Sequence, residues 1–288
     1  MNTGNRRRLC ILAVLLICLL SGFAHAHAQE TAMNVLLIGV DSAAEGQRGR
    51  SDVMMLARIR PEQGTVHLVS FLRDLYVSIP GVGKTRLNAA YHYGGEELLV
   101  KTLEKNFGIS VDRTATVHFS LLADLVDQLG GIELAIEERE LEHLNDMIQS
   151  YNADYGLTGG WIDQAGQQRL DGRQALCYSR IRKIDSDFQR TSRQQAVIAA
   201  MLERMSEMGR WELLKMAVRS LERVETNLAL GDLLTLSPLM GRLDQMQIFT
   251  AQVPFEGTYE ETTINGMMVL SPHLERCKTR LQSFLNEP

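Results

Sequence analysis

A dense group of basic residues lies between positions 180 and 193. Arg180, Arg182, Lys183, Arg190 and Arg193 fall within these fourteen residues, whereas the whole chain of 288 residues carries a formal charge of -5. Because this positive charge is local in an acidic protein, it indicates a bound anion. Guanidinium groups bind phosphate oxygens through two parallel hydrogen bonds, and a helix N-terminus adds free backbone N–H groups. The chemistry that we expect here is therefore phosphate binding.

A helix is predicted to begin inside this basic group. Ser186 or Asp187 can cap it, and apolar residues recur at helical spacing over residues 197–205. Arg190 and Gln194 are four residues apart, so they would share one face of the first turns. That face need not include Arg193. The alternative is a solvated basic helix end, which is a common surface feature.

Charged residues also stand at the ends of the first expected strands. Asp41 follows the first strand, and Arg50 and Asp52 lead into the second. Arg73 and Asp74 end the third. Open α/β sheets place ligand sites at such strand ends, and Mg²⁺ prefers one or two carboxylates together with phosphate oxygens and water. Each residue alone could be a turn residue, a strand cap or a surface ion-pair partner. Together with the basic group, they predict a site for a divalent cation and a phosphate.

Strands and helices alternate along most of the chain. The patterns predict strands at 34–40, 53–59, 66–72, 114–119, 132–136 and 246–253, strand pieces near 259 and at 267–270, and helices at 96–107, 120–129, 171–180, 187–208, 211–223, 232–243 and 271–285. This alternation favours an α/β fold, a three-layer α/β/α sandwich with a central mixed sheet. Residues 137–166 are polar, contain Gly159-Gly160 and break the periodic pattern, so we expect an insertion or lid there.

The first 28 residues have the pattern of a targeting segment. Three arginines at 6–8 precede an apolar run at 9–20, and Ala24-His-Ala26 and Ala26-His-Ala28 both fit the small-x-small rule for signal-peptide cleavage. The run is shorter than the about 20 residues that cross a bilayer. We therefore expect export with cleavage near Ala26 or Ala28. An uncleaved membrane anchor, with the arginines inside, is the alternative. Residues 29–288 would form one domain.

Composition narrows the class of protein further. With 45% hydrophobic residues and 6 prolines, the chain can bury a sizeable core and is not disordered. The net charge of -5 and the export pattern argue against DNA binding, which usually needs a basic surface. Cys177 and Cys277 remain after the targeting segment, and the sequence leaves open whether they pair.

Several ordered blocks resemble the LytR-CpsA-Psr family of bacterial cell-envelope proteins. They are Asn34-Val-Leu-Leu-Ile-Gly-Val-Asp41-Ser, Gly49-Arg50-Ser-Asp52-Val-Met-Met, Ser70-Phe-Leu-Arg73-Asp74, Leu87-Asn-Ala-Ala-Tyr-His-Tyr-Gly-Gly95, Leu170-Asp-Gly-Arg-Gln-Ala-Leu176, Arg180-Ile-Arg182 and Asp187-Phe-Gln-Arg190-Thr-Ser-Arg193-Gln194-Gln195. The resemblance implies an extracytoplasmic phosphotransferase that acts at the membrane surface. It would move a phosphoglycopolymer from a polyisoprenyl pyrophosphate carrier to peptidoglycan. A polyprenyl pyrophosphate hydrolase and a non-enzymatic lipid-phosphate-binding regulator are the alternatives.

The same resemblance assigns roles to residues of this chain. It implies that Asp41 and Asp52 bind Mg²⁺, or Mn²⁺ in its place. The catalytic candidates are Arg73, Asp74 and Arg182, and the pyrophosphate-binding candidates are Arg50, Arg73, Lys101, Arg180, Arg182, Arg190 and Gln194. For Lys101 a solvated surface lysine is the alternative. The general base is not identified, although Asp187 also lies near these blocks.

A hydrophobic tunnel for the isoprenoid is expected between the sheet and the helices over residues 197–224. Ordinary core packing would produce the same apolar composition there. Recognition of the polymer would fall on variable loops such as residues 137–166.

Overall fold

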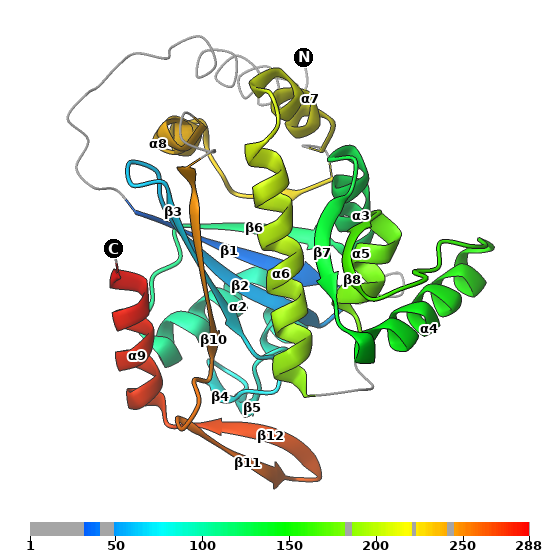
Figure 1. Ribbon diagram of the computed structural model, residues 1–288. Coiled ribbons are helices and arrows are strands. Elements are labelled where there is room, and N and C mark those ends of the chain that lie inside the picture. The colour runs from blue at the N-terminus through cyan, green and yellow to red at the C-terminus, as the bar shows by residue number, and fades with distance from the viewer. Residues whose placement is uncertain (1–31, 41–48, 182–185, 221–222, 241–244, 288) are drawn as a thin grey trace, which may run out of the picture.

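A six-stranded mixed sheet forms the centre of the molecule (Figure 1). The computed structural model describes residues 32–40, 49–181, 186–220, 223–240 and 245–287. The strands are β1 (Met33–Val40), β2 (Ser51–Arg60), β3 (Thr65–Phe71), β6 (Arg113–His118), β9 (Glu225–Thr226) and β10 (Gln247–Val253), in the order β10-β3-β2-β1-β6-β9. β1, β2 and β3 pair in antiparallel fashion, while β6 runs parallel to β1 and β10 parallel to β3. The mixed sheet is as predicted.

The middle strands are buried because both of their faces are covered. All seven residues of β3 are buried, and six of the eight residues of β1 are buried as well. Burial along the whole strand is typical of central strands. A tight turn connects β2 and β3, where the N–H of Gly64 donates to the carbonyl of Arg60 at 3.0 Å. Gly64 has a φ of 70°, which glycine adopts readily.

Helices cover both faces of the sheet, which gives the three predicted layers. On one face Leu56 packs in one core with Phe107 of α2 (Ala89–Phe107) and Leu281 of α9 (Leu274–Asn286). On the other face its neighbour Met55 packs in a core that includes Ile198 of α6 (Asp187–Ser206). Successive side chains of a strand point to opposite faces, so Met55 contacts one outer layer and Leu56 contacts the other. In Figure 1, α6 crosses in front of the sheet and α2 lies behind it.

A second core includes Val197, Ala200 and Met201 of α6. The elements that form it or pack against it are α3 (Phe119–Gln128), β7 (Ile132–Ile136), α4 (Glu138–Tyr155), β8 (Gly166–Leu170), α5 (Gly172–Ser179) and α7 (Arg210–Ser220). Cys177 belongs to this core and Cys277 to the core under α2 and α9, and both thiols are free. The two cysteines therefore do not pair.

The segment over residues 137–166, where we expected an insertion or lid, contains a long helix that the sequence patterns did not predict. Most of this segment is α4, which begins with a capping box formed by Glu137 and Glu140 and ends at the left-handed Gly156. Its buried residues are Glu140, Leu144, Ile148 and Asn152, at helical spacing. Because the first and last are polar, the buried stripe does not stand out as an apolar pattern.

The structure also differs from the sequence prediction at the start of α2 and in the segment just before it. α2 starts at Ala89, earlier than expected, with a break at Gly95, where φ is 64° and ψ is -153°. Just before it, β4 (Tyr76–Ile79) and β5 (Gly83–Arg86) form a hairpin that the sequence patterns did not reveal. A second hairpin, β11 (Tyr259–Ile264) with β12 (Met267–Pro272), confirms the predicted strand pieces.

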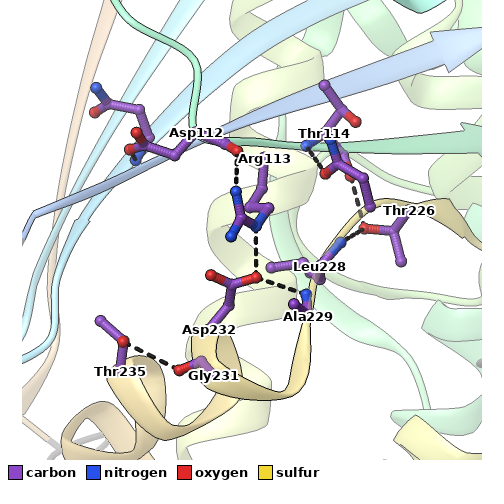
Figure 2. A network of polar contacts seen from close by, with 11 residues as sticks. Asp112, Arg113, Thr114, Thr226, Leu228, Ala229, Gly231, Asp232 and Thr235 are labelled. Atoms are coloured by element: carbon purple, nitrogen blue, oxygen red, sulfur yellow. Dashed lines mark hydrogen bonds and ion pairs between the residues drawn. The ribbon is translucent and has the colours of Figure 1, made fainter. Parts of the chain in front are cut away.

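Polar contacts connect the edge of the sheet, at β6 and β9, to α8 (Leu230–Met240), as Figure 2 shows. The carboxylate of Asp232 accepts hydrogen bonds from Arg113 Nε and from the backbone N–H of Ala229, both at 2.5 Å. The backbone carbonyl of Thr114 accepts a hydrogen bond from the hydroxyl of Thr226 at 2.6 Å.

Within the described residues, no helix combines the length and apolar character that a membrane span requires.

Candidate functional site

Arg73 lies at the centre of three carboxylates. Its Nη1 donates to Asp52 Oδ1 at 3.1 Å, and its Nε lies 3.3 Å from Asp187 Oδ1 and 3.6 Å from Asp74 Oδ2. Asp52 comes from the start of β2, Arg73 and Asp74 follow β3, and Asp187 opens α6. The structure therefore brings three of the strand-end residues together with the helix start.

The charge of Arg73 is fixed by this environment. Burial acts to lower the pKa of its guanidinium, but the carboxylates of Asp187, Asp74 and Asp52 outweigh burial, so the pKa is raised. The side chain is still 22% exposed, so part of it is accessible to solvent or to a ligand. Arg73 is thus a permanent cation at a partly open position, as phosphate binding requires.

The first turn of α6 carries the second arginine of the site. Arg190 Nη2 lies 2.5 Å from Asp187 Oδ1, the same oxygen that faces Arg73, and only 4% of the Arg190 side chain is exposed. Ser186 is the N-cap residue, but its side chain makes no capping hydrogen bond. A buried guanidinium is stable only when it is paired, so Asp187 holds Arg190 in place. Gln194, one turn later, is half-buried.

Arg180 lies near the ends of two parallel strands. Its guanidinium carbon is 5.3 Å from the ring centroid of Phe119, a cation–π contact. Phe119 directly follows β6, whose last residue pairs with Val40 at the end of β1. A Cβ placed on Gly39 would lie 3.6 Å from the Phe119 ring. Arg180 is therefore fixed beside the carboxyl end of β1. Two further predicted site residues, Asp41 and Arg182, lie outside the described residues.

Two predicted pyrophosphate-binding residues have a different environment. Lys101 Nζ lies 2.5 Å from Glu97 Oε1, one turn earlier on α2, and 59% of the lysine side chain is exposed. Arg50 is exposed just before β2. Neither makes a contact with Arg73 or Arg190 among the described residues. Their roles stay predictions that the geometry does not support directly.

Arg86 of β5 joins the site although the sequence analysis missed it. Its Nε lies 3.3 Å from Asp74 Oδ1, and its Nη2 donates to the carbonyl of Met268 in β12 at 2.9 Å. Arg86 therefore connects both hairpins to the carboxylate beside Arg73. Its only sequence signal was its position directly before the family-like block at 87–95.

Arg193 points into the protein interior, away from the site. Its Nε lies 2.7 Å from Glu140 Oε1, and the two side chains are 3% and 5% exposed. Its Nη1 donates to the carbonyl of Ile181 at 3.1 Å. Arg193 thus links α4 and α6 to the residue that follows Arg180. This agrees with the expectation that the face shared by Arg190 and Gln194 need not include it.

The donor atoms of the site suit a hard cation. Asp52, Asp74 and Asp187 offer carboxylate oxygens, which Mg²⁺ and Mn²⁺ prefer. Among the described residues there is no group of three or more His, Cys, Asp or Glu residues that could hold a metal ion. A magnesium ion that takes its other ligands from phosphate and water needs only one or two carboxylates. Asp52 fits that kind of site.

The sequence matches the LytR_cpsA_psr family over residues 21–283. The protein belongs to the LytR_cpsA_psr family. Among its relatives is the polyisoprenyl-teichoic acid–peptidoglycan teichoic acid transferase TagV of Bacillus subtilis (strain 168), which is 29% identical over 268 residues. That match covers 90% of this chain and 66% of the length of TagV.

Solved structures of TagT, a protein of B. subtilis, share the fold of this family member. TagT bound to LIIa-WTA is 27% identical with a TM-score of 0.71, and the match covers 92% of this chain and 95% of that chain. TagT with bound octaprenyl pyrophosphate lipid is 26% identical with a TM-score of 0.65, over the same shares of both chains. The predicted α/β fold is thereby confirmed.

Proposed function

We propose that the protein is an extracytoplasmic phosphotransferase that moves a phosphoglycopolymer from a polyisoprenyl pyrophosphate carrier to peptidoglycan. The observation that carries this proposal is the position of Arg73 and Arg190 on either side of one Asp187 oxygen. Asp187 orients both guanidinium groups, and the part of the Arg73 side chain that stays exposed can contact a phosphate oxygen. The similarity to TagT, which has been solved with an octaprenyl pyrophosphate lipid, supports the same ligand class here.

The reaction requires an acceptor hydroxyl and a good leaving group. The hydroxyl oxygen forms a bond to the phosphorus that carries the glycan, and the bond from this phosphorus to the bridging oxygen breaks. Polyprenyl monophosphate leaves with that electron pair, and the hydroxyl proton passes to a base. Catalysis of such a transfer depends mainly on positioned positive charge, which Arg73, Arg180, Arg182 and Arg190 would supply.

Asp74 has a positioning role in this proposal. Its carboxylate lies between Arg73 and Arg86, at 3.6 Å and 3.3 Å. Because two guanidinium groups engage its oxygens, it fixes the direction of both arginines toward the ligand. The proton acceptor is left open by this arrangement.

A magnesium ion is the proposed cofactor. Asp52, together with Asp41, would hold it, and Mn²⁺ could take its place. When bound, the ion would neutralise charge on the pyrophosphate oxygens. Arg73, which contacts Asp52 at 3.1 Å, would orient that carboxylate.

The isoprenoid chain is proposed to lie between the sheet and α6. Leu37 of β1 and Ile198 and Leu202 of α6 are only partly buried although they flank the core on that face. Apolar side chains that stay partly exposed between a helix and a sheet leave room for an apolar ligand.

Product analysis tests the proposal. The protein is incubated with a lipid-linked, radiolabelled phosphoglycan and purified peptidoglycan, and the label is followed by chromatography. Transfer predicts that the label enters peptidoglycan while polyprenyl monophosphate appears in equal amount. Label that never enters peptidoglycan would contradict transfer.

Hydrolysis is the second candidate, because the site is open to water. The side chains of Arg73 and Asp52 are 22% and 19% exposed, so a water molecule can approach where the acceptor hydroxyl would. The same incubation without peptidoglycan separates the two: a hydrolase releases the free phosphoglycan at an undiminished rate, whereas a transferase slows strongly.

Export is part of the proposed function. Residues 1–28 would direct the chain across the membrane, with cleavage near Ala26 or Ala28 favoured over a retained anchor. Mass spectrometry of the protein recovered from its native host distinguishes the two, because cleavage produces a mature N-terminus after one of these alanines. An intact N-terminus at Met1 would establish the anchor instead.

A further inference from the structure

An aromatic surface projects from the arm formed by α4 and the loop that leads to β8. Of the seven most exposed large hydrophobic side chains among the described residues, three belong to this arm: Tyr155, Leu157 and Trp161, at 65%, 47% and 47% exposure. Tyr151 stacks on Tyr155 with ring centroids 4.4 Å apart. A cluster of exposed aromatic side chains typically marks a binding surface. Figure 1 shows the arm extending away from the sheet.

The loop that carries Trp161 is held firmly on both sides of it. Asn145 of α4 accepts a hydrogen bond from the N–H of Ile162 and donates one to its carbonyl, both at 2.9 Å. On the other side, Gln174 of α5 donates to the carbonyl of Gly160 at 2.9 Å. Asn152 donates to the carbonyl of Gly159 at 2.9 Å. The backbone that carries the exposed indole is therefore held in place, which lowers the entropic cost of binding a ligand.

The arm is joined through Arg193 to Ile181, the residue that follows Arg180. Glu140, in the first turn of α4, forms the buried ion pair with Arg193, which in turn binds the carbonyl of Ile181. Asn145, the anchor of the Trp161 loop, lies five residues further along α4, about 7.5 Å by helical rise. The arm and Arg180 are therefore connected through one buried ion pair and one hydrogen bond.

The charge of the arm restricts what it can bind. Residues 137–166 contain seven carboxylates and one arginine, and only one of these carboxylates, Glu140, is neutralised by a buried arginine, so the surface is acidic. This surface repels phosphates, both those of an anionic donor polymer and those of anionic lipid headgroups. It does not repel an uncharged glycan, whose hydroxyl and amide N–H groups can donate hydrogen bonds to carboxylates.

Aromatic faces and carboxylates together match the chemistry of sugars. The C–H groups on one face of a pyranose ring carry partial positive charge, and the faces of indole and phenol rings are negative. We propose that Trp161, with Tyr155, binds the uncharged N-acetylhexosamine strand of the acceptor glycan. This assignment of the acceptor rests on the proposed transfer function, but the binding itself can be measured without any transfer.

Single-tryptophan variants test the binding directly, because the chain contains only two tryptophans. Trp211 is 57% exposed on α7, which lies at the top of Figure 1, well away from α4. In the Trp211→Phe variant all indole fluorescence comes from Trp161. We expect a saturable change in its emission when soluble β-1,4-linked N-acetylglucosamine oligomers are added. In the matched Trp161→Phe variant the emission of Trp211 should not respond.

The affinity for the same oligomers gives the second readout. Measured by calorimetry, Trp161→Ala should weaken binding about tenfold or more, as expected for an aromatic side chain at the centre of a contact. Trp161→Phe should recover part of the loss, whereas Trp211→Ala should match the wild type. In transfer assays Trp161→Ala should raise the KM for peptidoglycan and leave kcat nearly unchanged.

Three results would overturn the inference. Trp161 emission that ignores the oligomers would do so, and so would an unchanged acceptor KM in Trp161→Ala. Emission that responds to phosphatidylglycerol vesicles or to protein concentration instead would assign the surface to a membrane or to a second copy of the chain. Failure of the proposed function is distinguishable, because the wild type would then bind the oligomers without transferring a phosphoglycan.

Discussion

Asp187 Oδ1 lies 3.3 Å from Arg73 Nε, which joins the first turn of α6 to the end of β3. The same oxygen lies 2.5 Å from Arg190 Nη2. One carboxylate therefore orients two arginines that come from distant parts of the sequence. We regard this shared oxygen as the structural centre of the proposed pyrophosphate site.

Asp187→Asn should disrupt the orientation of both arginines while keeping the shape of the side chain. We expect kcat/KM for the lipid-linked donor to fall about 100-fold, the loss expected when groups that contact the substrate are displaced by about 1 Å. Steady-state transfer assays measure the effect. Glu203→Gln, an exposed carboxylate on the same helix, is the matched control and should behave as the wild type. Full activity of Asp187→Asn would show that this pairing is dispensable.

The buried pair of Glu140 and Arg193 should contribute to stability through its pairing. Each single variant, Glu140→Gln or Arg193→Met, leaves a charge unpaired at a position that is at most 5% exposed, so the free energy of unfolding should fall by about 3 kcal/mol. The double variant should lose clearly less than the sum of the two single losses. Urea unfolding of the four proteins measures this coupling. Losses that simply add would contradict a direct interaction between the two charges.

His67 should make the stability of the protein depend on pH. The imidazole is buried against Phe249 and Phe284, and Arg60 Nη1 lies 3.2 Å from its Nδ1. Burial, followed by the charges of Arg60 and Arg58, lowers the pKa of His67 below its ordinary value of 6.5. The unfolded chain therefore binds a proton more readily than the folded protein does. Stability should be greatest above pH 6.5 and fall as the pH drops from 6.5 toward the folded-state pKa.

The comparison of wild type with His67→Gln isolates this effect, because the other histidines are common to both proteins. Between pH 7.5 and pH 5.5, the free energy of unfolding should decrease more in the wild type than in the variant. Equal decreases would mean that His67 does not change its protonation on unfolding.

The strands and the layer order could be predicted because their signals are local. β1 is an almost wholly apolar run, and β3 is apolar at four of its seven positions, as expected of strands in a sheet covered on both faces. α4 could not be predicted in this way, because Glu140 and Asn152 occupy two of its four buried positions. Each is buried for a partner far away in the sequence, Arg193 and Arg173 respectively. Such pairings depend on the tertiary fold.

The same contrast between local sequence signals and tertiary pairings holds for the residues of the site. Asp52, Arg73 and Asp74 could be proposed because they follow or precede recognisable strands. Arg86 could not, because β4 and β5 have only four residues each and the patterns did not predict them. The role of Asp187 as a shared partner of two arginines also requires coordinates, since helical spacing places it near Arg190 but does not relate it to β3.

Removal of divalent cations should stop transfer if Mg²⁺ is the cofactor. We expect a chelator to abolish the activity and Mg²⁺ to restore it, with Asp52→Asn requiring a higher Mg²⁺ concentration for half-maximal rate. Rates measured over a Mg²⁺ titration check this. Binding of N-acetylglucosamine oligomers should not respond to the chelator. Transfer that continues at full rate in the chelator would exclude a role for the ion.

The most direct test of the central claim is the transfer rate of Arg73→Ala. The assay contains a labelled polyisoprenyl pyrophosphate-linked glycan, purified peptidoglycan and Mg²⁺. The account predicts a fall of about 100-fold or more, because a positioned charge that stabilises the transition state is lost. Arg219→Ala removes an exposed arginine of α7 and should leave the rate unchanged. A rate for Arg73→Ala within a factor of about two of the wild type would contradict the account, because this transition-state charge would then be dispensable.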